Sequence, residues 1–128
     1  MSSIVLDASA LLALLNGETG AEKLTPQLLS IATCSTVNLA EVQRKLITRG
    51  LSPHEAWVAA LGPIREATAF TTEHARTAGT LIAQTRTLGL SLGDRACLAL
   101  GLALKAPVYT TDPSWRKLKL EVRIHVIR

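Results

Sequence analysis

The sequence predicts an α/β fold in which a central, mostly parallel sheet of about five strands is covered by helices on both faces. Short apolar runs containing β-branched residues alternate along the chain with longer runs of helical character. Parallel neighbours in a sheet need crossover connections, which helices supply. The chain has 128 residues, 48% of them hydrophobic, and contains no internal repeat, low-complexity segment or linker. We therefore expect residues 1–128 to form a single domain with a sizeable core.

The first half of the chain opens with a predicted strand and helix. Residues 3–6 form a short run with β-branched members, whereas residues 8–15 are too long a run, and too rich in Ala and Leu, for a strand. Ser52 and Pro53 predict a helix start, because Ser is a good N-cap and Pro suits the first helical position. The remaining predicted elements of this half are helices over residues 21–29 and 38–47 and a strand over residues 31–35.

The second half continues the alternation. The predicted elements are a strand near residues 67–71, helices over 73–88 and 92–105, a strand over 107–110, a short helical turn over 115–118 and a strand over 122–127. Residues 96–104 are apolar nearly all round the helix, so this helix is either central in the fold or part of a subunit interface.

Cysteine usage and the apolar runs indicate a cytoplasmic protein. Cys34 and Cys97 lie far apart, each in an apolar stretch, which is typical of core residues rather than of a disulfide framework or zinc site. The N-terminus has no basic leader and is interrupted by Asp7, so we expect no signal peptide. The longest apolar run is about half of what a bilayer crossing needs.

The charge balance favours an anionic partner. The net charge is +4, from fourteen basic and ten acidic residues. Four of the acids, Asp7, Glu41, Asp94 and Asp112, are candidates for a shared cation site. Without them, six acidic residues remain against fourteen basic ones. A basic surface around an acidic centre suits a phosphodiester substrate.

The chain contains only three aspartates, Asp7, Asp94 and Asp112, and each lies where a predicted helix begins. Glu41 lies in a fourth such place. Each acid alone is explained as a helix cap: Asp7 and Asp112 as N-caps, and Asp94 and Glu41 as the fourth residues of capping boxes that start at Ser91 and Asn38.

Taken together, the four acids predict a cation site. The carboxyl ends of parallel strands share one edge of the sheet, where ligands bind, and Asp7, Glu41 and Asp112 follow strands closely. A helix starting at Ser91 would bring Asp94 to the same edge. Clustered carboxylates repel one another unless a cation compensates, and oxygen ligands suit Mg²⁺ or Mn²⁺. No histidine joins them, which disfavours zinc.

Four segments carry a resemblance to a known family. The strings IVLDASALLALL, NLAEV, LSLGDRACLALG and VYTTD resemble the PIN domain, and more narrowly the VapC toxins of toxin–antitoxin pairs. The match runs in order from residue 4 to the last predicted strand, and LSLGDRACLALG is its most specific part.

The resemblance implies a three-layer α/β/α fold and a metal-dependent endoribonuclease that leaves 5′-phosphate and 3′-hydroxyl ends. Asp7, Glu41, Asp94 and Asp112 match the family's acidic positions, as metal ligands directly or through water, with Glu41 as a ligand or as the base. Mg²⁺ or Mn²⁺ is the implied cofactor. Ser9 and Thr110 match supporting polar positions.

The implied partners are RNA, a cognate VapB-type antitoxin and a second copy of the chain. Arg95, Arg116 and Lys117 are candidates for contacting RNA, although a solvated or ion-paired role explains them as well. Trp115 either stacks on a base or packs the end of the fold. The apolar helices over residues 8–15 and 96–104 are candidates for the dimer contact.

Two other classes compete with a nuclease. A phosphoacceptor receiver domain has a similar size and binds Mg²⁺, but it needs paired acids after the first strand, and Asp7 has no acidic neighbour. A binding module that keeps the fold and acts only through a partner is the second alternative.

Overall fold

The computed structural model describes residues 3–128 and contains one five-stranded sheet, in the order β3-β2-β1-β4-β5. All four pairings between neighbouring strands are parallel. The strands are β1 (Ile4–Leu6), β2 (Ala32–Ser35), β3 (Glu66–Thr68), β4 (Val108–Thr110) and β5 (Ile124–Val126). The predicted α/β class and strand number are confirmed. The order differs from the 2-1-3-4-5 order of receiver domains.

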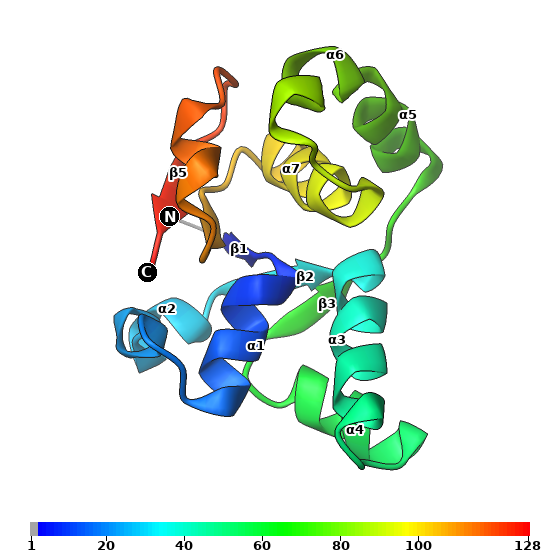
Figure 1. The fold of residues 1–128 in the computed structure, drawn as a ribbon, viewed down its shortest axis with the longest axis vertical. Helices are drawn as coiled ribbons and strands as arrows, with labels where there is room; N and C mark the ends of the chain where they lie inside the picture. The colour runs from blue at the N-terminus through cyan, green and yellow to red at the C-terminus, as the bar shows by residue number, and fades with distance from the viewer. Residues whose placement is uncertain (1–2) are drawn as a thin grey trace.

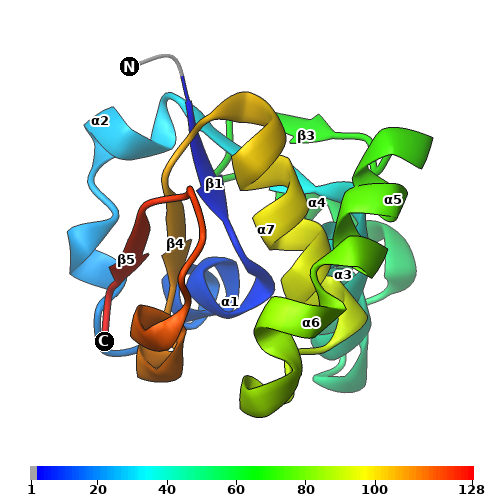
Figure 2. The ribbon, with the colours of Figure 1, turned by 90° about the horizontal axis from the view of Figure 1, so that it is seen from above.

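Helices cover both faces of the sheet and complete three layers (Figure 1). The helices are α1 (Ala8–Asn16), α2 (Pro26–Leu29), α3 (Thr36–Thr48), α4 (Pro53–Leu61), α5 (Thr72–Thr80), α6 (Ile82–Thr85) and α7 (Leu92–Leu104), with 3₁₀ turns η1 (Ala21–Lys23), η2 (Arg86–Leu88) and η3 (Pro113–Lys117). Helices α1 to α4 lie on one face, and α5, α6 and α7 lie on the other, as the view from above also shows (Figure 2).

Strand register brings the carboxyl ends of the central strands to one edge. Leu6 of β1 is level with Tyr109 of β4, and the Asp7 amide donates to the Tyr109 carbonyl at 3.1 Å. Residues that follow β1, β2 and β4 therefore emerge side by side. Helix α7 begins at this edge too, because its first turn packs against α3, which follows β2.

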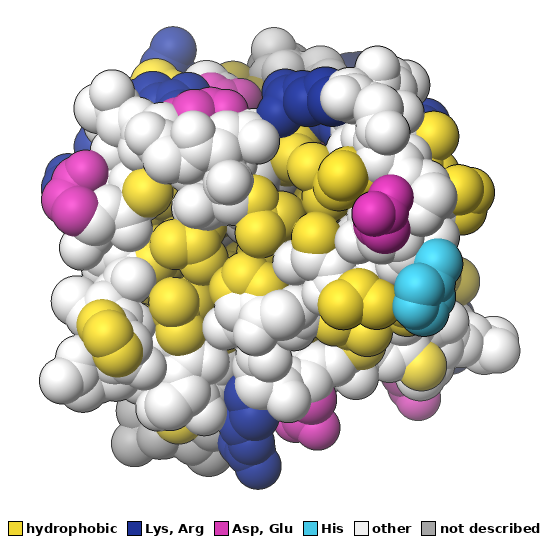
Figure 3. All heavy atoms as spheres, turned by 90° about the horizontal axis from the view of Figure 1, so that it is seen from below, with side chains coloured by type: hydrophobic (Ala, Val, Ile, Leu, Met, Phe, Trp, Pro, Cys, Tyr) yellow, Lys and Arg dark blue, Asp and Glu magenta, His cyan; other side chains and the backbone are white. Residues whose placement is uncertain are grey.

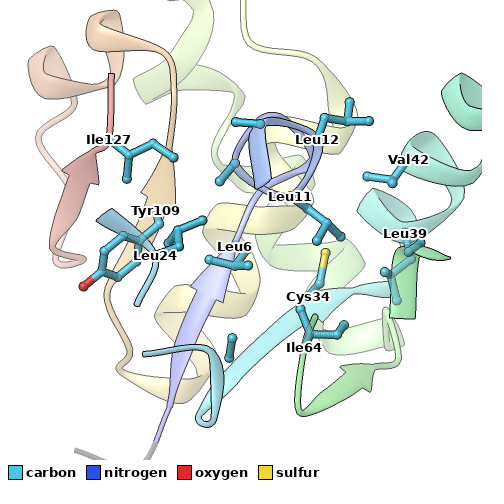
Figure 4. Packing of buried hydrophobic residues seen from close by; sticks show 14 of the residues in the cluster. Leu6, Leu11, Leu12, Leu24, Cys34, Leu39, Val42, Ile64, Tyr109 and Ile127 are labelled. Carbon is cyan, nitrogen blue, oxygen red and sulfur yellow. The ribbon is translucent and has the colours of Figure 1, made fainter. Parts of the chain in front are cut away.

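The core forms two clusters, one on each face of the sheet. The alternation of β1 divides its side chains between them: Ile4 and Leu6 enter the cluster under α1 and α3, and Val5 enters the cluster under α7. Leu11 of α1 and Cys34 of β2 meet Leu6 at the centre of the first cluster (Figure 4). Both cysteines are free and buried, as predicted.

The outer surface over α1, α2 and α4 is partly apolar. Hydrophobic side chains gather across the face seen from below (Figure 3), and the half-buried ones packed on the first cluster include Leu14, Leu15, Leu28, Leu29, Trp57 and Leu61. Within residues 3–128, the structure has no helix both long enough and apolar enough to cross a membrane.

Two predicted helices are broken. The expected helix over residues 21–29 divides into η1 and α2, because Thr25 caps a new helix and Pro26 occupies its first position. The expected helix over 73–88 divides into α5, α6 and η2. The strand predicted near residues 67–71 lies at Glu66–Thr68, because Thr71 has already become the N-cap of α5. The apolar helix of residues 96–104 lies within α7 and is central in the fold, with Ala96 to Gly101 buried.

The C-terminal residues close over the start of the chain. Arg128 forms an ion pair with Glu18 (Nη2···Oε1 2.7 Å) and donates to the Thr19 carbonyl. Gly20 packs so closely against the Ile127 backbone that a Cβ there would lie 2.8 Å from the Ile127 carbonyl carbon. These contacts fix β5 against the loop after α1.

Candidate active site

Asp7 is the most enclosed of the four acids, with 4% of its surface exposed. It follows β1 and is the N-cap of α1, and its Oδ1 accepts from the Ala10 amide at 2.8 Å and from the Ser9 hydroxyl at 2.7 Å. Its Oδ2 accepts from the Thr110 hydroxyl at 2.6 Å. Burial raises the pKa of Asp7 from 3.8 to about 6, the three donors oppose that rise, and the charge of Asp94 adds to it.

The two hydroxyls around Asp7 are committed as donors. Each hydroxyl has one proton, so while Ser9 and Thr110 both donate to Asp7, each accepts from elsewhere. Ser9 Oγ accepts from the Thr111 amide at 3.0 Å, and Thr110 Oγ1 accepts from the Asp112 amide at 3.2 Å. This network ties the ends of β1 and β4 together and favours the ionised form of Asp7.

Glu41 projects from α3 toward the first turn of α7. Its Oε1 accepts from the Asn38 amide at 2.9 Å, and the same amide donates to the Gly93 carbonyl at 3.0 Å. A Cβ built on Gly93 would lie 2.6 Å from Glu41 Oε2 and 2.7 Å from its Cδ. The Glu41 carboxylate therefore lies directly against the backbone of α7, one residue before Asp94.

Asp94 is the third residue of α7. It forms the predicted capping box with Ser91: the Asp94 Oδ2 accepts from the Ser91 amide at 2.9 Å, and the Ser91 hydroxyl accepts from the Asp94 amide at 3.2 Å. Asp94 lies close enough to Asp7 to raise the pKa of that carboxyl. Charges on Asp7, Asp94 and Glu41 all raise the pKa of the Cys97 thiol, after burial, which is the largest cause. Glu41 and Asp94 thus lie at the first turn of α7, and Asp7 is near enough for its charge to act on the same thiol.

Asp112 lies two residues beyond β4 and is exposed. It is the N-cap of η3, where its Oδ1 accepts from the Ser114 amide at 2.9 Å, with Pro113 at the first position, as the sequence predicts. Its own amide donates to Thr110, which in turn donates to Asp7. Asp112 is thus connected to Asp7 through one threonine.

Within residues 3–128, none of the four acids forms an ion pair: the one ion pair there is that of Arg128 with Glu18. The donor set consists of carboxylate oxygens, which fits Mg²⁺ or Mn²⁺. In the described part of the chain, no three acidic, histidine or cysteine side chains converge closely enough to hold an ion directly. Mg²⁺ keeps several waters, so a water-mediated site is compatible with this spacing.

The other predicted residues have different positions. Arg95 is half-buried and donates from Nη1 to the Ala78 carbonyl at 2.8 Å, which joins α7 to α5. Arg116 and Lys117 are exposed on η3, beside Asp112. Trp115 is 1% exposed and belongs to the core cluster under α7, so it packs the fold and is not available to stack on a base.

Two residues that support the site, Asn38 and Gly93, were not predicted to belong to it. The proposed capping box between Asn38 and Glu41 is wrong, because Ser35 is the N-cap of α3 and accepts from the Val37 amide. Asn38 is instead buried inside the first turn and bridges Glu41 to α7. The i, i+3 spacing of Asn38 and Glu41 was the available signal. Nothing in the sequence indicates that Gly93 faces Glu41.

Comparison with known proteins identifies the family. The structure of DNA-bound VapBC from Salmonella typhimurium is similar, with 16% identity, a TM-score of 0.75 and 100% of both chains covered. A Mycobacterium tuberculosis VapC toxin that cleaves the sarcin-ricin loop is 23% identical, with a TM-score of 0.72 over 94% of this chain and 99% of that one. VapBC2 from Rickettsia felis, bound to promoter DNA, is 16% identical, with a TM-score of 0.73 and 98% of each chain covered.

A search of curated proteins finds no matching sequence. The family description that matches is the PIN domain, over residues 4–120. That match includes all four acids of the candidate site, Asp7, Glu41, Asp94 and Asp112. The chain therefore belongs to the PIN domain family.

Proposed function

We propose that this protein is a metal-dependent endoribonuclease and the toxin of a VapBC-type toxin–antitoxin pair. The observation that carries the proposal is the buried Asp7 carboxylate, which is held by three donors, lies close to Asp94 and forms no ion pair within residues 3–128. A fold that keeps a costly uncompensated acid at the ligand-binding edge is best explained by a cation that binds there.

The ion would be held by Asp7, Asp94 and Asp112, directly or through water, with Glu41 as a further ligand or as a base. A bound Mg²⁺ or Mn²⁺ would stabilise charge on the phosphate oxygens and lower the pKa of the attacking water. The protein's own contribution is orientation: Ser9 and Thr110 fix both oxygens of Asp7, and Asn38 fixes one oxygen of Glu41.

The choice of RNA as substrate has two supports. Arg116 and Lys117 are exposed next to Asp112, where cations attract a phosphate backbone. The similar toxin from Mycobacterium tuberculosis is described as cleaving the sarcin-ricin loop, which supports an RNA target for this chain as well.

The antitoxin partner is supported by the similar structures, several of which are toxin–antitoxin complexes, including one from Klebsiella pneumoniae. We also propose a homodimer.

Expression of the chain alone should arrest growth, and Asp7→Asn should remove the arrest. Arrest that persists in that variant would show that the protein acts by binding and not by catalysis.

The direct test is cleavage of RNA by the purified protein with Mg²⁺ or Mn²⁺. We expect Asp94→Asn to lose cleavage, because Asn cannot supply a charged ligand, while Glu73→Gln, an exposed acid in the first turn of α5, keeps it. Chelation should also abolish cleavage. Undiminished cleavage by Asp94→Asn, or cleavage that is indifferent to chelation, would refute the proposal.

A further inference from the structure

The contact between Glu41 and the first turn of α7 points to two residues that act on the site through Glu41. We propose that Asn38 and Gly93 are positioning residues: Gly93 provides the space in which the Glu41 carboxylate lies, and Asn38 fixes its orientation there. The catalytic meaning of this inference rests on the proposed function, but the geometry it invokes does not.

Gly93 is the residue that permits the close approach. The three heavy atoms nearest to a Cβ at this position all belong to the Glu41 carboxyl group, and all are closer than real Cβ contacts allow. Gly93 lies in regular helix without a positive φ, so its backbone has no need of glycine. Helices favour Ala over Gly. The absence of a side chain is therefore explained by Glu41 rather than by the helix.

Asn38 supplies a donor that no other side chain of its shape can replace. Its two amide protons face two acceptors, Glu41 Oε1 and the Gly93 carbonyl, and this arrangement fixes which way round the amide lies. A carboxyl group at this position would either repel both acceptors or, once protonated, donate to only one. Asn38 is 1% exposed, so water cannot take its place easily.

One side chain thus links the acid of α3 to the backbone immediately before Asp94 of α7. The link sets how far Glu41 lies from Asp94, and nothing in it requires a bound ion. Both positioning residues act only through Glu41. Their substitution should therefore have no further effect on metal affinity or RNA cleavage once the Glu41 carboxylate has been removed.

The first experiment measures thermal unfolding without metal. Gly93→Ala should lower the melting temperature in the native background, because the Cβ displaces the Glu41 carboxylate and breaks its partly buried hydrogen bond to Asn38, and should raise it in a Glu41→Ala background, where that carboxylate is absent. Gly79→Ala is the matched control: Gly79 is a helical glycine with no heavy atom within 4 Å of its Cβ position, so it should raise the melting temperature in both backgrounds. An equal loss from Gly93→Ala in both backgrounds would show that another neighbour is the obstacle.

The second experiment measures Mn²⁺ affinity by calorimetry together with RNA cleavage. We expect Asn38→Asp and Asn38→Ala to weaken binding ~10- to 100-fold, as is typical of residues that orient a metal ligand. On the Glu41→Ala background, Asn38→Ala should add nothing. Asn16 provides the control, because it also donates to a glutamate, Glu18, at 3.1 Å, but on an exposed surface. Additive losses would refute positioning through Glu41.

The two experiments separate this inference from the proposed function. If the melting temperatures follow the predicted reversal and no variant, nor the native chain, binds Mn²⁺ or cleaves RNA, the packing inference stands and the nuclease proposal fails. If the native chain binds Mn²⁺ and cleaves RNA but the reversal is absent, the nuclease proposal stands and the role of Gly93 is refuted.

Discussion

Asp7 and Asp112 follow neighbouring strands of one sheet, yet their carboxylates have opposite environments. Asp7 is 4% exposed and accepts three hydrogen bonds, and Glu41 and Asp94 beside it are braced by Asn38 and Ser91. Asp112 is exposed, and its carboxylate accepts from one backbone amide. The β1–α7 side of the edge is therefore fixed before any ligand arrives, whereas the η3 side can adjust to one.

The two environments differ in how much the charge of the acid lowers the stability of the fold. The raised pKa of Asp7, about 6 instead of 3.8, means that the folded protein resists its charge by about 3 kcal/mol at neutral pH. On the η3 side, Asp112 is exposed and water reaches its carboxylate. On the β1–α7 side, the buried charge of Asp7 lowers the stability of the fold, and a bound cation would remove that cost.

The largest contrast is expected between Asp7→Asn and Asp112→Asn. Asp7→Asn should lower RNA cleavage about 10²–10³-fold, because a preorganised charge is lost, and Asp112→Asn about tenfold. In metal-free buffer at pH 7, Asp7→Asn should raise the free energy of unfolding by up to about 3 kcal/mol. Asp112→Asn should leave it unchanged, because Asn is also a good N-cap. Equal effects of the two variants on stability would remove the distinction between the two sides.

The pH dependence of stability should also reveal the fixed side. Between about pH 4 and pH 6 the folded protein holds a proton on Asp7 that the unfolded chain has released, so stability falls as the pH rises through this window. The difference in unfolding free energy between the native chain and Asp7→Asn should therefore grow from pH 4 to pH 6 and then level off. Denaturant titrations without metal measure it. Parallel stability curves for the two proteins would contradict the shift.

Thr110→Val should have a smaller effect on the same side of the site. It removes the shortest hydrogen bond to Asp7, which also holds the pKa of that carboxyl down, so the upper end of the pH window should rise, and cleavage should fall ~10- to 100-fold. Thr33→Val is the matched control, because Thr33 is also a buried strand threonine but bonds to Thr68. A similar change in both variants would indicate a general strand effect.

The smallest effect is expected on the adjustable side. Alanine at both Arg116 and Lys117 should raise KM for RNA a few-fold and reduce the salt dependence of binding, by a slope of about 1 for each phosphate that the variant no longer binds. The value of kcat should not change. Arg44 and Lys45, exposed on α3, serve as the control pair. A loss that is independent of salt would exclude a phosphate-binding role.

The existence of the strands and helices was predicted from the sequence better than their first and last residues. The central strands β1, β2 and β4 are short and fully buried, and burial favours apolar residues wherever the sheet is covered on both faces. The edge strand β3 contains Glu66 and is mostly exposed. The first and last residues of the elements depended on polar residues that can either lie within an element or cap the next helix. Thr25 with Pro26, and Thr71, begin new helices at positions where the apolar periodicity alone predicts that the preceding element continues.

The candidate site was predictable in its acids but not in its support. Asp7, Asp94 and Asp112 are helix caps and also lie at the carboxyl edge, so the two explanations are compatible for these three residues. Glu41 does not cap its helix, because Ser35 ends β2 in an extended conformation and takes that position. The fit of Glu41 against Gly93 is a contact between distant parts of the chain, which no local spacing reveals.

The bond between Thr110 and Asp7 also bears on when the site is completed during synthesis. The two residues are 103 positions apart, and β4 must pair with β1 before the bond can form. A growing chain that has not yet released β4 from the ribosome has Asp7, Glu41 and Asp94, but it lacks Asp112 and the Thr110 hydroxyl that fixes Oδ2 of Asp7. Under the proposed function, the nascent chain is therefore inert until β4 has left the ribosome and has paired with β1.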